Sequence, residues 1–190
     1  FDGRYKTMGD VYTTGSSRPK VFEVQSVRNG VWYHCARVPK SEAQVKDQAL
    51  IKRHMHILSG LEHPHVCKVV ECFETKTEYV MVCERAYTPP MLEFMMNRDG
   101  HGWAGKGERE HAEIIRQILS ALSHFHAHGI AHGRLEPAVL LIAAPDGGGR
   151  PKGHGSEAVP RGPPQVKLAD FGYGFVLREP FGRREALLDY

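Results

Sequence analysis

Cysteine is scarce in this sequence and is never clustered. The 190 residues contain four cysteines, each alone inside an apolar run: Cys35, Cys67, Cys72 and Cys83. They lack the density of a disulfide framework and the C-x-x-C spacing of a zinc site, so we interpret them as reduced core residues of an intracellular protein. Long apolar runs are also missing, since none approaches the roughly 18 residues of a membrane span. The sequence therefore predicts a cytoplasmic protein with no membrane partner.

Neither sign of charge dominates the composition. Lys and Arg total 25 against 22 Asp and Glu, which gives a net charge of +3. The basic residues are scattered among the acids and form no stripe of the kind that binds a phosphate backbone, so no nucleic-acid partner is expected. Hydrophobic residues make up 41% and charged residues 25% of the chain, which is typical of a globular protein.

The first half of the chain reads as short strands with one embedded helix. Asn29-Gly30 is a tight-turn signal between two alternating segments. Ser41 is a plausible cap for the helix that follows, and His63-Pro64 ends it. The expected strands cover residues 21–24, 31–38, 66–73 and 79–83, and the expected helix covers 41–61.

The second half is mainly helical. Residues 108–128 carry an apolar stripe at helical spacing with acidic residues in the first turns, and Gly129 closes the helix. Two short apolar segments follow at 139–142 and 166–168. Between them, the Gly/Pro-rich stretch 143–164 has no periodicity and is predicted to be a disordered loop insertion.

Two motifs after the long helix carry a family resemblance. Residues 128–141 read H-G-I-A-H-G-R-L-E-P-A-V-L-L, and residues 167–172 read K-L-A-D-F-G. Together, in this order and after this helix, they resemble the catalytic and metal-binding loops of eukaryotic protein kinases. Residues 61–66, L-E-H-P-H-V, look like the segment that follows the regulatory helix in these enzymes. The chain is most similar in character to the calcium/calmodulin-dependent and calcium-dependent Ser/Thr kinases.

This resemblance implies an α+β, two-lobed fold. A small lobe at residues 1–85 would contain a five-stranded antiparallel sheet and one helix. A mainly helical large lobe at 86–190 would be incomplete, reaching through D-F-G to the start of the activation segment. The hinge is expected near Glu84 to Thr88. Because Phe1 is not a start methionine and no A-P-E motif follows, we expect the chain to be an excerpt or a truncated product.

The resemblance also locates the catalytic positions, and most of them are replaced. The family's H-R-D-x-K-x-x-N reads here as His132-Gly133-Arg134-Leu135-Glu136-Pro137-Ala138-Val139. The base position holds Arg134, which cannot accept a proton. The lysine position holds Glu136, and the second metal-ligand position holds Val139, which has no side-chain oxygen. Asp170 survives, either as a magnesium ligand or for loop geometry alone.

The nucleotide positions are similarly altered. The phosphate-covering loop, residues 14–20, has Thr14, Ser16 and Pro19 at its three glycine positions. Ala36 stands at the small-lobe lysine and His54 at its glutamate partner. Alternation points the neighbouring Arg37 to the opposite face, unless a one-residue bulge turns it back. The resemblance also places Cys83, Glu84 and Ala86 beside the nucleotide.

These replacements predict a pseudokinase, acting as a scaffold or allosteric partner of another protein. ATP with magnesium would bind weakly or not at all. The first alternative is an active Ser/Thr kinase that transfers the γ-phosphate to a protein substrate with displaced groups such as Arg37 and Asp170. The second is a defective gene product with no function of its own.

Overall fold

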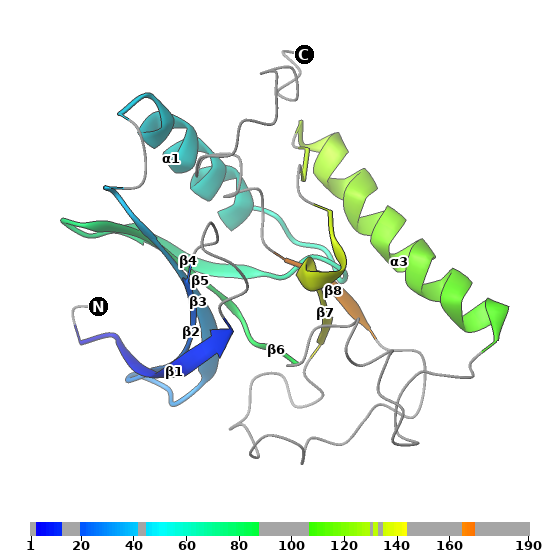
Figure 1. Cartoon of the computed structure of the whole chain (residues 1–190), viewed down its shortest axis with the longest axis horizontal. Helices are drawn as coiled ribbons and strands as arrows, with labels where there is room; N and C mark the ends of the chain where they lie inside the picture. The colour runs from blue at the N-terminus through cyan, green and yellow to red at the C-terminus, as the bar shows by residue number, and fades with distance from the viewer. Residues whose placement is uncertain are drawn as a thin grey trace.

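The described residues form two sheets, two α-helices and one short 3-10 helix, η1 (Pro137–Val139) (Figure 1). The computed structural model describes residues 3–12, 20–41, 45–87, 107–129, 131–132, 135–143 and 165–169. Residues 14–19 of the predicted phosphate-covering loop, residues 144–164 of the predicted insertion, Arg134 and Asp170 lie outside these ranges. The insertion is predicted to begin at residue 143, but Ala143 is the last residue of a strand.

The first sheet is five-stranded and antiparallel, as the sequence predicts. Its strand order is β1-β2-β3-β5-β4. Its strands are β1 (Tyr5–Tyr12), β2 (Lys20–Ser26), β3 (Trp32–Pro39), β4 (Val69–Glu74) and β5 (Glu78–Glu84). The predicted turn between β2 and β3 is confirmed: Gly30 has a φ of +71°, and its N–H donates to the carbonyl of Ser26.

The two edge strands of this sheet approach each other through their side chains. The Tyr5 hydroxyl on β1 donates to a Glu71 carboxylate oxygen on β4 at 2.7 Å. Arg4 also pairs with Glu71, and its guanidinium lies 4.2 Å from the centroid of the Phe73 ring. Because β1 and β4 are at opposite ends of the strand order, the sheet must curl strongly to bring them together.

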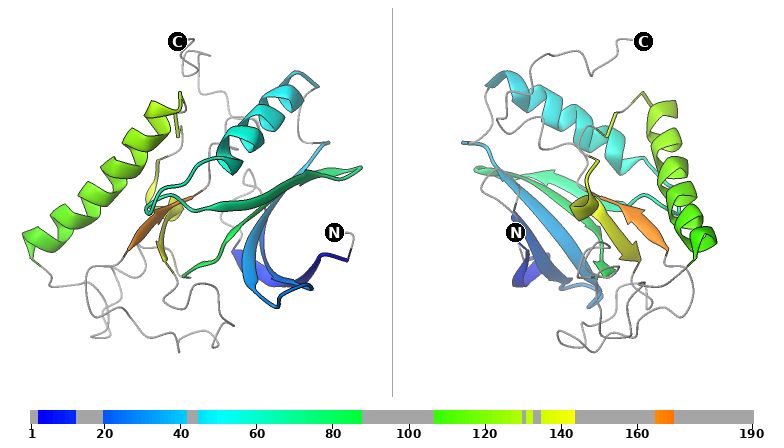
Figure 2. Two further views of the ribbon diagram at one scale, coloured as in Figure 1. Left: turned by 180° about the vertical axis from the view of Figure 1, so that it is seen from behind. Right: turned by 45° about the vertical axis from the view of Figure 1, so that its right-hand side comes forward.

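One helix covers a face of this sheet (Figure 2). Helix α1 spans Val45–Ser59 and buries Ile51, Met55 and Leu58. The predicted helix is confirmed over Val45–Ser59, whereas Ser41, its expected cap, lies in a turn, and residues 42–44 are outside the described residues. The predicted strand from residue 66 is wrong at its start. Residues 66–68 precede β4, and Val66 forms an isolated bridge to Leu168.

The second sheet has three strands and carries the long helix. Its order is β6-β7-β8, with β6 (Ala86–Tyr87), β7 (Leu140–Ala143) and β8 (Val166–Leu168). Helix α3 (Glu108–Ala127) packs on β8, where the Gln117 side-chain oxygen accepts the Val166 N–H at 2.8 Å. Gly129 follows the helix with a φ of +68°, as its position predicts.

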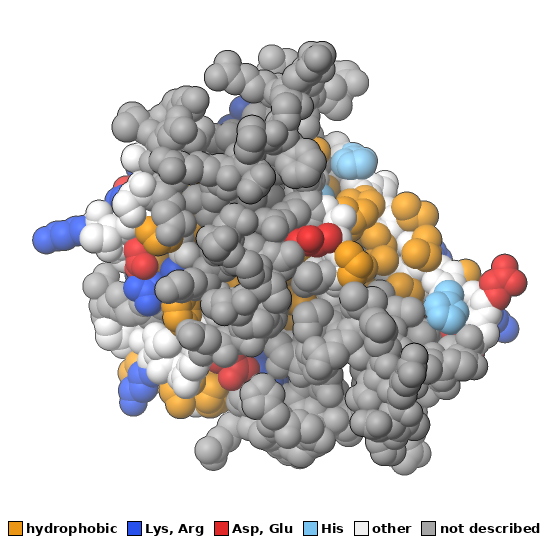
Figure 3. Space-filling view, viewed as in Figure 1, with side chains coloured by type: hydrophobic (Ala, Val, Ile, Leu, Met, Phe, Trp, Pro, Cys, Tyr) orange, Lys and Arg blue, Asp and Glu red, His pale blue; other side chains and the backbone are white. Residues whose placement is uncertain are grey.

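Only part of the apolar stripe that the sequence shows on α3 is buried in the fold. Ile114, Ile118 and Phe125 are buried, but Ile115 is 54% and Leu119 59% exposed. Hydrophobic side chains are visible over this helix in the space-filling view (Figure 3).

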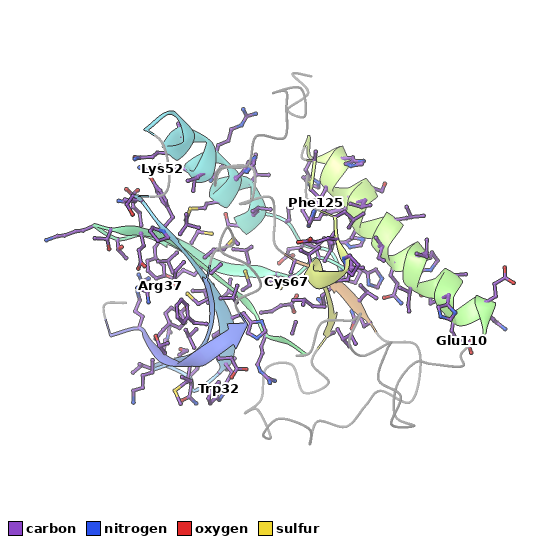
Figure 4. All side chains as sticks on the ribbon, in the orientation of Figure 1. Trp32, Arg37, Lys52, Cys67, Glu110 and Phe125 are labelled. Atoms are coloured by element: carbon purple, nitrogen blue, oxygen red, sulfur yellow. The ribbon has the colours of Figure 1, made fainter. Side chains whose placement is uncertain are left out.

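A single core joins the two sheets. It combines residues of the first sheet and α1, such as Val38 and Ile51, with Phe125 of α3, Val139 and Leu168. Two main-chain hydrogen bonds reinforce this junction, from the Cys67 N–H to the Leu168 carbonyl and from the Leu168 N–H to the His65 carbonyl, both 2.9 Å long. Figure 4 shows Cys67 and Phe125 in this region.

Candidate functional site

Strand β3 places Ala36 and Arg37 on opposite faces of the first sheet. Pairing with β2 and with β5 continues residue by residue through both positions, with no register shift. Ala36 packs against the core beneath α1. The Arg37 Nε donates to a Glu78 carboxylate oxygen at 3.0 Å, and its guanidinium lies 5.3 Å from the centroid of the Phe22 ring. The regular alternation therefore holds the Arg37 charge on the face away from Ala36, without the bulge that would turn it back.

A buried polar cluster that the sequence reasoning missed lies on the same face as Ala36. Glu23 on β2 stands directly opposite His34 on β3, so their side chains share a face. Arg85, whose side chain is only 2% exposed, ion-pairs with Glu23 through its Nε at 3.2 Å. Polar residues at the inward positions of two apolar strands were the available signal for this cluster.

His34 is the neutral member of this cluster. It is buried, and its Nε2 has no hydrogen-bond partner among the described residues. Burial, and secondly the positive charge of Arg85, lower the pKa of His34 to about 4. The ring is therefore neutral at pH 7, and the cluster consists of one neutral imidazole beside one ion pair.

The residues at the end of β5 are engaged in the fold itself. One carboxylate oxygen of Glu84 accepts the Lys68 N–H at 2.7 Å and the Lys167 Nζ at 2.8 Å. A hydrogen bond with the Cys67 thiol, and then burial, hold the pKa of Cys83 well above its usual range. Ala86, which is also buried, begins β6. Glu84 thus ties three segments together: the end of β5, the loop before β4, and β8.

Replacing Glu84 with alanine is expected to destabilise the fold. The Lys68 N–H and the half-buried Lys167 ammonium would both lose an acceptor, which we expect to cost about 1–3 kcal/mol. Chemical denaturation measures this change. Glu62→Ala is the matched control, because Glu62 also pairs with Lys68 but is 74% exposed, and such pairs contribute about 0–1 kcal/mol. Equal losses in the two variants would contradict the structural role of Glu84.

His54 lies on α1 at the edge of its buried face, between Ile51 and Met55 in the helical sequence. Burial, and secondly the positive charge of Arg53, lower the pKa of His54 below its ordinary value. At pH 7 this position therefore carries a neutral ring and offers no negative charge to a cation on β3.

One side-chain and two main-chain hydrogen bonds connect the loop after α3 with the end of β8. The His132 Nε2 donates to the Ala169 carbonyl at 2.8 Å, and its ring meets Phe125 edge-on, with centroids 5.8 Å apart. The Ala169 N–H donates to the Val139 carbonyl at 3.0 Å, and the Val139 N–H to that of Glu136 at 3.1 Å. The predicted site residues His132, Glu136 and Val139 therefore lie together beside Ala169, the residue that precedes Asp170.

The described part of this site does not fit a magnesium ion. The Val139 side chain is 2% exposed, lies in the apolar core and has no oxygen to offer. Among the described residues, no group of three or more His, Cys, Asp or Glu side chains is arranged to hold a metal.

No described helix is long and apolar enough to cross a membrane.

Comparison with known proteins identifies one family over most of the chain. Residues 14–182 match the model of the protein kinase domain. Human calcium/calmodulin-dependent protein kinase type IV is 27% identical over 189 residues, which cover 92% of this chain and 36% of the relative.

Two further relatives match shorter parts of the chain. A probable myosin light chain kinase of Dictyostelium discoideum is 32% identical over 65% of this chain and 33% of its own length. Rat serine/threonine-protein kinase D2 is 29% identical over 79% of this chain and 15% of its own length. The chain thus spans about a third or less of the length of these relatives.

Proposed function

The chain belongs to the protein kinase domain family, and on this premise we propose that it is a pseudokinase that acts as a scaffold or allosteric partner of another protein. Protein kinases transfer a phosphoryl group by positioning nucleotide phosphates and metal ions, with a lysine–glutamate ion pair and metal-binding side chains in place. The proposal is that this chain has lost those parts while keeping the fold that held them.

The placement of Ala36 carries the proposal. Ala36 occupies the family's lysine position, and the adjacent Arg37 is held on the other face by Glu78 and Phe22. Even if a nucleotide entered, the Arg37 charge would have to leave a half-buried ion pair and cross the strand to reach its phosphates. With His54 neutral as well, neither member of the ion pair has a substitute among the described side chains of α1 or of the Ala36 face of β3.

The polar cluster beside Ala36 also supports weak or absent ATP binding. The resemblance places the nucleotide between β3 and the end of β5, where Glu23 and His34 face the buried Arg85. Glu23 and Arg85 already neutralise each other beside the uncharged His34. A bound nucleotide base would have to displace these side chains or leave one of the two charges desolvated.

The four cysteine thiols indicate the redox environment of the chain. All four cysteines are free, and three of them are buried. Free thiols at this depth suit a reducing compartment, so the proposal places the chain in the cytoplasm.

We expect ATP, with or without magnesium, to leave the thermal unfolding midpoint of the chain unchanged up to millimolar concentration. A ligand that binds only the folded state raises the unfolding midpoint in a concentration-dependent way. At a hundredfold excess over Kd, the free energy of unfolding increases by about 2.7 kcal/mol. Differential scanning fluorimetry with ATP and ADP measures this, and near-ultraviolet circular dichroism shows that the sample is folded.

Two variants separate the proposed pseudokinase from an active kinase with displaced groups. A magnesium-dependent rise that disappears in both Arg37→Ala and Asp170→Asn would favour the active kinase, and a phosphotransfer assay would then follow. Glu62→Ala serves as the surface control, because Glu62 is exposed and lies outside the predicted site. A flat response in the wild type and in every variant would support the pseudokinase.

A further inference from the structure

Four imidazole rings meet where the 61–68 loop passes helix α3. The rings of His63 and His124 are stacked, with centroids 5.0 Å apart and planes inclined by 28°. His128, one turn further along α3, lies 4.5 Å from His124, and His65 lies 5.5 Å from His63. The stack connects the loop that leads into the first sheet with the helix that covers the second. Its residues have no part in the proposed function.

The hydrogen bonds of His63 determine where its proton sits. Its Nδ1 accepts the His65 N–H at 3.1 Å, so this nitrogen is unprotonated. The proton of the neutral ring is then on Nε2, which donates to the Ser120 hydroxyl on α3 at 3.0 Å. A second proton has only Nδ1 to occupy, where it would face the His65 N–H and break that bond. The pair of hydrogen bonds that fixes the orientation of the His63 ring against α3 therefore requires a neutral His63, although the Nε2 proton that faces Ser120 is kept in the charged ring.

His124 adds a separate geometric feature to the stack, a buried ring nitrogen. Its Nε2 is buried and has no hydrogen-bond partner among the described residues. Both nitrogens of a cationic imidazole carry a proton, so a charged His124 would bury an N–H without an acceptor. His128 differs, because its Nδ1 already donates to the His124 carbonyl at 2.8 Å, and a cationic ring does this equally well.

The surrounding charges also oppose protonation of the stack. Burial, and then the possible positive charges of His124, His65 and Lys167, lower the pKa of His63 below its ordinary value of 6.5. Glu113 on α3, the acid on the His65 side, is engaged by Arg116 and Gln117. Glu62, the chain neighbour of His63, pairs with Lys68.

We propose that the His63–His124 stack is an acid-sensitive contact that holds the 61–68 loop against α3 at neutral pH and releases it when either ring is protonated. Because the folded state binds the proton of His63 less tightly than the unfolded chain, the unfolded chain holds more protons below pH 6.5. Stability contributed by the stack is therefore complete above that pH and decreases as the pH falls toward the lower pKa of the folded state. The junction between the two sheets becomes dependent on pH.

Hydrogen exchange of the chain at two pH values tests this proposal. The amides of Cys67 and Leu168 report on the junction directly, since both donate across it. After correction for intrinsic rates, we expect the wild-type amides to exchange several-fold faster at about pH 5.5 than at about pH 7.5, a range that brackets histidine titration. His124→Phe keeps a ring in the stack but cannot be protonated, so the acid-induced acceleration should shrink.

A second variant and a matched control complete the test. His63→Asn retains an acceptor near the His65 N–H without titrating, and it too should lose most of the pH response. His126→Gln removes an exposed histidine from the same helix turn and should behave as the wild type. A wild-type chain with no pH-dependent acceleration would overturn the proposal. The proposal would also be overturned if His124→Phe and His63→Asn both responded to acid as strongly as His126→Gln. If His63→Asn does not fold, a folded His124→Phe variant with an unaltered acid response would be enough to overturn it.

Discussion

Replacing Phe125 with alanine should lower the free energy of unfolding by about 3–5 kcal/mol, the usual loss for a buried phenylalanine. The Phe125 side chain is 1% exposed and lies in the core that joins both sheets. It also supports the ring of His132, which it meets edge-on. At about 2–4 °C per kcal/mol for a chain of this size, the unfolding midpoint should drop by roughly 10 °C. Calorimetry or circular dichroism on heating measures the change.

Leu119→Ala is the matched control for this substitution. Leu119 is on the same helix but is 59% exposed, so truncation there leaves no cavity. Its effect should stay within about 0.5 kcal/mol. If Leu119→Ala cost as much as Phe125→Ala, the exposed face of α3 would be packed in solution, and the core described above would not be the main support of the helix.

Replacing Val139 with asparagine should destabilise the chain and restore no activity. Asparagine is the family's residue at this metal-ligand position, yet the Val139 side chain lies in the apolar core, 2% exposed. An amide without a hydrogen-bond partner there costs about 1–3 kcal/mol, in addition to the lost apolar packing. Urea denaturation measures the loss, and the thermal shift with ATP and magnesium should remain flat.

The comparison for Val139→Asn is the same exchange at an exposed site. Val27→Asn introduces the same amide at a residue that is 53% exposed, and it should change stability by no more than about 0.5 kcal/mol. A Val139→Asn variant that kept wild-type stability and gained a magnesium-dependent shift would contradict the buried placement of this residue. It would also reopen the active-kinase alternative.

Much of the fold was predictable from local patterns. Alternation of apolar residues located β2 and β3, because the side chains of a strand alternate between two faces, and a short continuous apolar run located β5. Asn29-Gly30 and Gly129 marked a turn and a helix end, because glycine readily adopts the positive φ found at Gly30 and Gly129. Boundaries were less certain. Ser41 has the chemistry of a helix cap, but it lies in a turn, and the described helix α1 begins at Val45.

For the candidate site, too, the sequence predicts one part and only the fold shows the other. Motif order determined which residues stand at the lysine, base and metal-ligand positions, and that assignment remains a prediction of sequence resemblance. Local spacing contains no information about the partners of those residues. Glu84 is predicted to lie beside a nucleotide, and only the fold shows that its carboxylate accepts hydrogen bonds from the Lys68 N–H and the Lys167 ammonium.

The sequence by itself determined the order of strands and helices and the absence of a lysine at position 36, since both depend on residue type and short-range period. Only the tertiary structure decided that Arg37 pairs with Glu78, that Arg85 reaches Glu23, and that His63 stacks on His124. These pairs lie 41 to 62 residues apart along the chain. Chain folding therefore has to bring them together before burial and charge can act between them.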